Sequence, residues 1–101
     1  MTILDQIIDH KKTELPGLKA SAPQFETLKK KRPSLYETLI RANRLQVISE
    51  MKRASPSKGD IATHIEPVEQ ATQYEKAGAA CISVLTETKY FKGCYADLNA
   101  V

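Results

Sequence analysis

Two short apolar segments separated by a stretch of helix length constrain the fold of this chain more than any other feature. Residues 45–52 and 80–85 have the composition of strands, and the second is apolar enough to be buried on both faces. Between them, Pro67 stands where a helix can begin and Gly78 where it can end. A connection of this length joins parallel strands through a right-handed crossover. The sequence therefore predicts a strand–helix–strand unit with a parallel sheet.

Local signals predict further elements around this unit. Ser34 and Glu37 have the spacing of a capping box, in which each side chain binds the other residue's backbone amide. In the first half of the chain we expect a helix over about 2–14 that Pro16–Gly17 ends, a weak helical turn at Phe25 and Leu28, and a helix from Leu35 to about Asn43. In the second half we expect a loop at 54–59 and a helix beginning at Tyr95.

Composition excludes several classes of protein. The longest apolar run is residues 79–82, whereas a membrane-spanning helix needs ~20 residues, so no membrane partner is expected. The net charge is +3, and the excess lies mostly in residues 29–32, for which a solvated helix face is favoured over a nucleic-acid contact. Cys81 and Cys94 are too few for a disulfide scaffold and match no metal motif, which favours reduced thiols in a cytoplasmic protein.

A parallel pair of strands cannot form a finished domain by itself. Both of its edges lack a neighbouring strand, and both of its faces need to be covered. The other residues of the chain are too few to provide this. We therefore expect the sequence to be the opening part of a larger α/β domain, with a small complete domain as the less favoured alternative.

The end of the first strand carries charges where a buried face would carry Val, Ile or Leu. Glu50 and Lys52 share one face of the strand, and a polar loop that includes Ser55 follows directly. Burying either charge alone is costly, but in parallel α/β folds ligands bind beyond the carboxyl ends of the strands. Lys52 is therefore a candidate to bind an anionic substrate, with Glu50 holding the lysine or handling protons. An ordinary surface ion pair at a fraying strand end fits the spacing equally well.

The sequence around these residues resembles the first-strand signature of indole-3-glycerol phosphate synthase. The stretch in question is Ile48-Ser49-Glu50-Met51-Lys52-Arg53-Ala54-Ser55-Pro56-Ser57-Lys58-Gly59. Residues 79–93 look like the second strand and following loop of the same family, and the distance between the two stretches also agrees. Residues 34–43 resemble part of the segment that precedes the family's barrel, so the resemblance covers essentially the whole chain.

This resemblance implies a TIM (β/α)8 barrel of which the chain holds only the beginning. Residues 1–44 would be an N-terminal helical extension, and residues 45–101 would supply strand 1, helix 1, strand 2 and the start of helix 2. A complete barrel takes ~250 residues. The family's general-acid lysine, its second catalytic glutamate and its main phosphate-binding residues lie on later strands, so the segment alone is expected to be inactive.

The family closes the indole ring of indole-3-glycerol phosphate, a carboxy-lyase step of tryptophan biosynthesis that uses no metal or organic cofactor. Its substrate, 1-(2-carboxyphenylamino)-1-deoxyribulose 5-phosphate, loses carbon dioxide and water. The resemblance implies that Glu50 orients groups around the reacting centre and is a candidate for proton transfer, and that Lys52 anchors substrate anions. It also implies that Ser55 and Phe91 help bind the substrate, with Phe91 near the substrate's ring; a loop residue tucked onto the barrel is an equal alternative for Phe91.

Two other functions compete with this interpretation. Another phosphate-binding barrel enzyme of tryptophan or histidine biosynthesis would share the architecture. A non-enzymatic anion-binding module would use residues 29–32 but would leave Glu50 and Lys52 unexplained. Fusion to or association with another tryptophan-pathway enzyme is left open, as is self-association of the segment through its strand edges.

Overall fold

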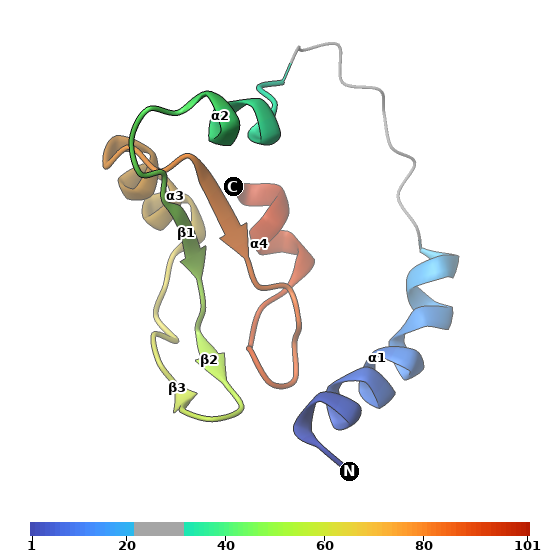
Figure 1. The fold of residues 1–101 in the computed structure, drawn as a ribbon. Coiled ribbons are helices and arrows are strands. Elements are labelled where there is room, and N and C mark those ends of the chain that lie inside the picture. The colour runs from blue at the N-terminus through green and yellow to red at the C-terminus, as the bar shows by residue number, and fades with distance from the viewer. Residues whose placement is uncertain (22–31) are drawn as a thin grey trace. The chain divides into compact units, whose positions relative to one another are not determined.

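A computed structural model of the protein describes residues 1–21 and 32–101 (Figure 1). The chain divides into two compact units, Met1–Arg32 and Pro33–Val101, which are described separately. The elements in chain order are α1 (Ile3–Ala20), α2 (Leu35–Arg41), β1 (Ile48–Met51), β2 (Ala54–Ser55), β3 (Gly59–Asp60), α3 (Pro67–Lys76), β4 (Cys81–Val84) and α4 (Tyr95–Ala100). The predicted turn at Phe25 and Leu28, and Lys29 to Lys31 of the basic run, lie outside the described residues.

Helix α1 begins at a capping box and is longer than the sequence predicts. The Thr2 hydroxyl accepts a hydrogen bond from the Asp5 amide at 3.2 Å, and the Asp5 carboxylate accepts one from the Thr2 amide at 2.8 Å. The prediction that the helix ends at Pro16–Gly17 is wrong, because α1 continues to Ala20. A proline inside a helix removes its own amide from the hydrogen-bond ladder and crowds the carbonyl four residues earlier, but α1 accommodates both, and the Ser21 amide still closes the last turn on the Gly17 carbonyl at 3.0 Å.

The second unit is built around a parallel pair of strands, as predicted. In Figure 1, β1 and β4 lie side by side, with Ile48 opposite Cys81 and Glu50 opposite Ser83. Helix α3 forms the connection between them. Both strands are shorter than the predicted segments 45–52 and 80–85. Strand β4 is half-buried along its length, not buried on both faces, because a single neighbouring strand leaves much of the sheet uncovered.

The ends of α3 follow the predicted local signals. Pro67 occupies the first turn, and the Glu66 carboxylate caps the helix by accepting from the Glu69 amide at 2.8 Å. After the C-terminal cap at Ala77, Gly78 adopts a φ of +90°, a conformation that a residue with a Cβ atom rarely takes. These two signals fix where the crossover between β1 and β4 begins and ends.

Helix α2 contains one half of the predicted capping box. The Ser34 hydroxyl accepts from the Glu37 amide at 3.2 Å. The Glu37 carboxylate lies 3.8 Å from Nη2 of Arg41 one turn later, at the last residue of the helix. The helix is therefore capped by Ser34, while Glu37 forms an i,i+4 ion pair.

The segment predicted as a loop at 54–59 contains a small hairpin. Strands β2 and β3 pair antiparallel, with Ala54 opposite Asp60 and Ser55 opposite Gly59. The carbonyl of Arg53 accepts from the amides of Ile61 and Ala62 at 2.7 and 2.9 Å, which holds the base of the hairpin closed. Each of its strands is only two residues long, which is too short for strand periodicity to appear in the sequence.

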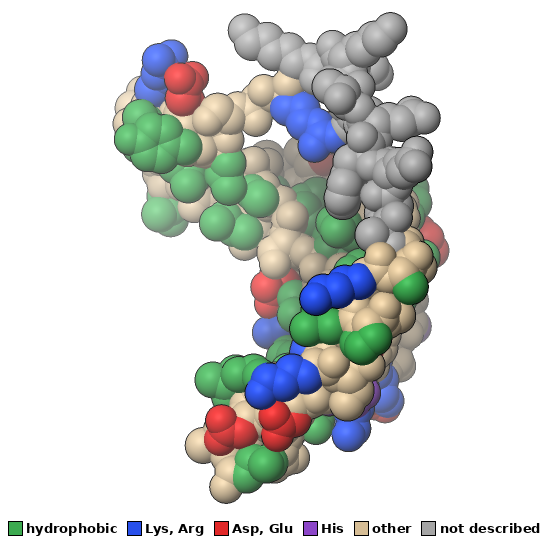
Figure 2. Space-filling view, turned by 90° about the vertical axis from the view of Figure 1, so that its right-hand side faces the viewer, with side chains coloured by type: hydrophobic (Ala, Val, Ile, Leu, Met, Phe, Trp, Pro, Cys, Tyr) green, Lys and Arg blue, Asp and Glu red, His purple; other side chains and the backbone are tan. Residues whose placement is uncertain are grey.

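The apolar core of the described residues is small. Met51 and Ala54 are 5% and 2% exposed, whereas Leu45, Val47 and Ile48 around the start of β1 are exposed. Figure 2 shows apolar side chains lying open at the surface among charged ones. Among the described residues, no helix combines the length and the apolar character needed to cross a membrane.

Candidate functional site

Glu50 and Lys52 form an ion pair at the carboxyl end of β1. Lys52 Nζ lies 3.0 Å from Glu50 Oε1, and the two side chains are 37% and 42% exposed respectively. Met51 between them points the other way and is buried. The alternation of a strand therefore places both charges on the open face, as the sequence predicts.

Strand β4 adds a third residue to this pair. Ser83, directly opposite Glu50 in the register, donates a hydrogen bond from Oγ to Glu50 Oε2 at 2.9 Å. Each carboxylate oxygen of Glu50 thus has one partner, Lys52 on Oε1 and Ser83 on Oε2. Sequence analysis did not identify Ser83, although it is the one polar residue in β4 besides Cys81.

Both partners stabilise the charged form of Glu50. The hydrogen bond from Lys52 and then that from Ser83 lower the pKa of the Glu50 carboxyl below its ordinary value of 4.5. At neutral pH this site therefore presents an ionised carboxylate beside an ammonium group. Such a pair can bind an anion through the lysine and accept a proton through the glutamate.

Phe91 lies next to the lysine. Lys52 Nζ is 6.0 Å from the centre of the Phe91 ring, at the outer limit of a cation–π contact. Phe91 comes from the loop between β4 and α4, so the structure brings together residues that are 39 positions apart or more. Three of the residues singled out from the sequence, Glu50, Lys52 and Phe91, therefore share one site.

The fourth of these residues, Ser55, has its contacts within the hairpin. Its hydroxyl accepts from the Lys58 amide at 3.2 Å and lies 3.5 Å from the Ser57 hydroxyl. The described structure places no hydrogen bond between Ser55 and the Glu50–Lys52 pair. Ser55 thus shapes the turn that follows the strand end.

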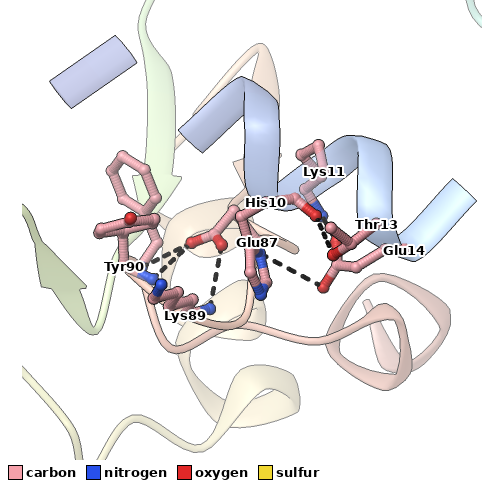
Figure 3. Close-up of polar contacts among 8 residues, drawn as sticks. His10, Lys11, Thr13, Glu14, Glu87, Lys89 and Tyr90 are labelled. Carbon is pink, nitrogen blue, oxygen red and sulfur yellow. Dashed lines mark hydrogen bonds and ion pairs between the residues drawn. The ribbon is translucent and has the colours of Figure 1, made fainter. Parts of the chain in front are cut away.

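A buried carboxylate orders the loop that carries Phe91. Glu87 accepts hydrogen bonds from the amides of Lys89, Tyr90 and Phe91 at 3.0, 2.7 and 3.0 Å (Figure 3). Three donors on one carboxylate fix the backbone just before the aromatic ring.

Figure 3 also shows the separate ion pair between Lys11 and Glu14 of α1, at 2.7 Å.

Gly93 allows the same loop to close on itself. Its amide donates to the Glu87 carbonyl at 2.9 Å. A Cβ atom at this position would lie 1.8 Å from the Leu85 carbonyl oxygen, so no larger residue fits without moving the backbone. Glycine is therefore required here by a close backbone approach.

Arg53 forms hydrogen bonds to α4, to the loop before α4 and to the segment before α3. Its guanidinium donates to both carboxylate oxygens of Asp97 in α4, and also to the carbonyls of Lys92 and Ile65 at 3.3 and 3.4 Å. The hydrogen bonds between Arg53 and Asp97 raise the pKa of Arg53 and hold the pKa of Asp97 below its usual value. Sequence analysis missed both residues, although alternation places Arg53 on the buried side of the strand end, where a charge needs a partner.

A second, more exposed ion pair links the hairpin to the same loop. Lys92 Nζ contacts Asp60 Oδ1, and both side chains are largely exposed. Lys92 also adopts a φ of +55°, which turns the backbone between Phe91 and Gly93. In the described part of the chain, no group of three or more His, Cys, Asp or Glu residues is arranged to hold a metal ion.

These features define a class of protein: an α/β chain with a parallel strand pair and a charged site at the carboxyl end of its first strand. The family model described as indole-3-glycerol phosphate synthase matches residues 4–101. The chain belongs to the indole-3-glycerol phosphate synthase family, which confirms the resemblance found in its sequence.

Similar proteins that align with all or nearly all of this chain carry the same name. Indole-3-glycerol phosphate synthase of Oceanobacillus iheyensis is 45% identical over 101 residues, which is 100% of this chain and 39% of the relative. The synthase of Exiguobacterium sibiricum is 46% identical over 101 residues, with the same two shares. That of Bacillus cereus is 46% identical over 98 residues, 97% of this chain and 37% of the relative. The chain therefore spans less than two-fifths of the length of these relatives.

Proposed function

We propose that the intact protein containing this chain is a carboxy-lyase that closes the indole ring in tryptophan biosynthesis. The substrate is 1-(2-carboxyphenylamino)-1-deoxyribulose 5-phosphate, and the products are indole-3-glycerol phosphate, carbon dioxide and water. The observation that carries this proposal is the Lys52–Glu50 pair, which lies beside Phe91 at the carboxyl end of β1 in a member of this family.

The chemistry of the substrate matches the groups at this strand end. The substrate carries a carboxylate, a phosphate and an aromatic ring. The Lys52 ammonium attracts the anionic groups, by about 4 kcal/mol for a pair 4 Å apart at an effective dielectric constant of about 20. The Phe91 ring offers an apolar surface to the aromatic ring. Ser55, whose turn follows the strand, is proposed to line the same site.

Ring closure with loss of carbon dioxide and water requires protons to be taken up and released. Glu50 is ionised at neutral pH and can orient the reacting groups or accept a proton. Lys52 holds the carboxylate of Glu50 and the anion of the substrate on the same side of the strand end. The general acid is proposed to come from a later strand, so the 101-residue chain by itself is expected to give no turnover.

The finer architecture follows from the same proposal. Residues 1–44 form an extension and residues 45–101 the first strands and helices of a (β/α)8 barrel, in which ligands bind at the carboxyl ends of the strands. The enzyme is proposed to act in the cytoplasm on a small phosphorylated substrate, with no metal or organic cofactor.

The test is product formation by the intact protein. The purified protein is incubated with the substrate, and indole-3-glycerol phosphate is identified by chromatography and mass. We expect product with the intact protein and none with the isolated residues 1–101. An intact, folded protein that forms no product would overturn the proposal.

A further inference from the structure

Ser83 occupies a position that a strand would normally give to an apolar residue. It lies in the middle of β4 between Ile82 and Val84, and all the residues of the strand are half-buried. Its side chain is on the same face of the sheet as Glu50, because the two residues are paired in the parallel register. A serine at this point gives up the free energy of burying an apolar side chain, which favours a specific polar role for its hydroxyl.

The hydroxyl has one specific contact in the described structure. Ser83 Oγ lies 2.9 Å from Glu50 Oε2, while Lys52 Nζ lies 3.0 Å from Glu50 Oε1. The carboxylate is therefore held at both oxygens, from its own strand and from the neighbouring strand. The serine side chain is short and uncharged, so it contributes a hydrogen bond to Glu50, whereas Lys52 contributes a charge.

We propose that Ser83 is a positioning residue for Glu50: its hydroxyl fixes one carboxylate oxygen so that the other stays on Lys52 and the pair faces the substrate as a unit. This inference rests on the proposed function. Without the hydroxyl, the Glu50 side chain can rotate, and its geometry with Lys52 is held from one side only.

A positioning role for Ser83 changes the acid–base behaviour of Glu50, which a purely structural role would not do. Hydrogen bonding from Ser83 favours the ionised form of Glu50, after the larger effect of Lys52. Removing it raises the pKa of Glu50 towards its ordinary value, so a larger fraction of Glu50 is protonated at acid pH. The acid limb of the kcat/KM profile therefore moves to higher pH.

The experiment compares variants of the intact protein that differ in this hydroxyl. Ser83→Thr keeps the hydroxyl, and Ser83→Val has nearly the shape of threonine but lacks the hydroxyl. Both replacements are β-branched residues, which are common in β-strands. We expect Ser83→Val to lower kcat about tenfold with little change in KM, because the variant loses about one hydrogen bond to a charged group. Ser83→Thr should restore most of the activity. Ser49→Ala, which removes a hydroxyl from the opposite face of β1, is the control and should behave like the wild type.

A second readout separates this inference from the proposed function. The Glu50 carboxyl carbon is followed by NMR during an acid titration of the intact wild-type, Thr and Val proteins. We expect the midpoint pH of the Glu50 titration to be higher in Ser83→Val than in the wild type and in Ser83→Thr. Equal midpoints together with equal kcat would overturn the role of Ser83 and leave the proposed function intact. A wild-type protein without product would overturn the proposed function, while the titration would still report on Ser83.

Discussion

The guanidinium of Arg53 and the carboxylate of Asp97 form a two-pronged ion pair that connects the end of β1 to the first turn of α4. Their side chains are only 19% and 10% exposed. The same guanidinium binds the carbonyl of Lys92, next to Phe91. The residue that follows Lys52 in the sequence thus holds the loop that places an aromatic ring beside Lys52.

Removing one partner of this pair should destabilise the chain. In Asp97→Ala, the Arg53 charge remains in a largely buried position without its carboxylate, and we expect a loss of about 3 kcal/mol in the free energy of unfolding. Urea unfolding measures this value. The matched control is Asp60→Ala, which removes the exposed partner of Lys92 and should cost less than about 1 kcal/mol. Equal losses in the two variants would contradict a structural role for the Arg53–Asp97 pair.

The same pair predicts the pH dependence of stability. The pKa of Asp97 is lowered from its ordinary value of 3.8, so its ionisation contributes stability above the unfolded-state pKa. This contribution is lost as the pH falls through the lower, folded-state pKa. Between about pH 5 and pH 2, stability should fall more steeply in the wild type than in Asp97→Asn. Parallel pH curves from thermal unfolding would show that Asp97 makes no such contribution.

Gly93 should not tolerate a side chain. In Gly93→Ala the new Cβ would lie 1.8 Å from the Leu85 carbonyl oxygen, so the loop that carries Phe91 must move. We expect a loss of more than about 2 kcal/mol in unfolding free energy. The control is Gly17→Ala in α1, where a Cβ meets nothing within 4 Å and should stabilise the helix by about 0.5–1 kcal/mol. Calorimetry measures the free energy of unfolding of both variants. An unchanged value in Gly93→Ala would contradict the observed loop geometry.

Local signals account for the part of the fold that could be predicted. Pro67 and Gly78 mark the ends of α3, and the alternation around Met51 separates the buried from the open face of β1. These features depend on backbone preferences of single residues. Helix α1 continues past Pro16, because a single proline weakens a helix through a lost hydrogen bond and a steric clash without always ending it, and the local Pro16–Gly17 signal does not report how well the neighbouring turns hold.

The parts that were missed depend on pairing between distant residues. Arg53 and Asp97 are 44 positions apart, and Glu50 and Ser83 are 33 apart. Their contacts depend on strand register and on how the loops fold over the sheet, which no local pattern encodes. Glu50 and Lys52 were found because they are two positions apart on one strand. The division at residues 44 and 45 into an extension and a barrel stays a prediction, as do the roles of Ser55 and Phe91 in substrate binding.

The most direct test of the central claim is the kcat/KM of the intact protein with Lys52→Ala for ring closure, compared with Lys76→Ala at the end of α3. The account predicts at least a hundredfold loss for Lys52→Ala, about 2.7 kcal/mol of transition-state stabilisation, and a value within about twofold of the wild type for Lys76→Ala. Equal, near-wild-type values for both variants would contradict it, since the ammonium at the end of β1 would then have no part in the reaction.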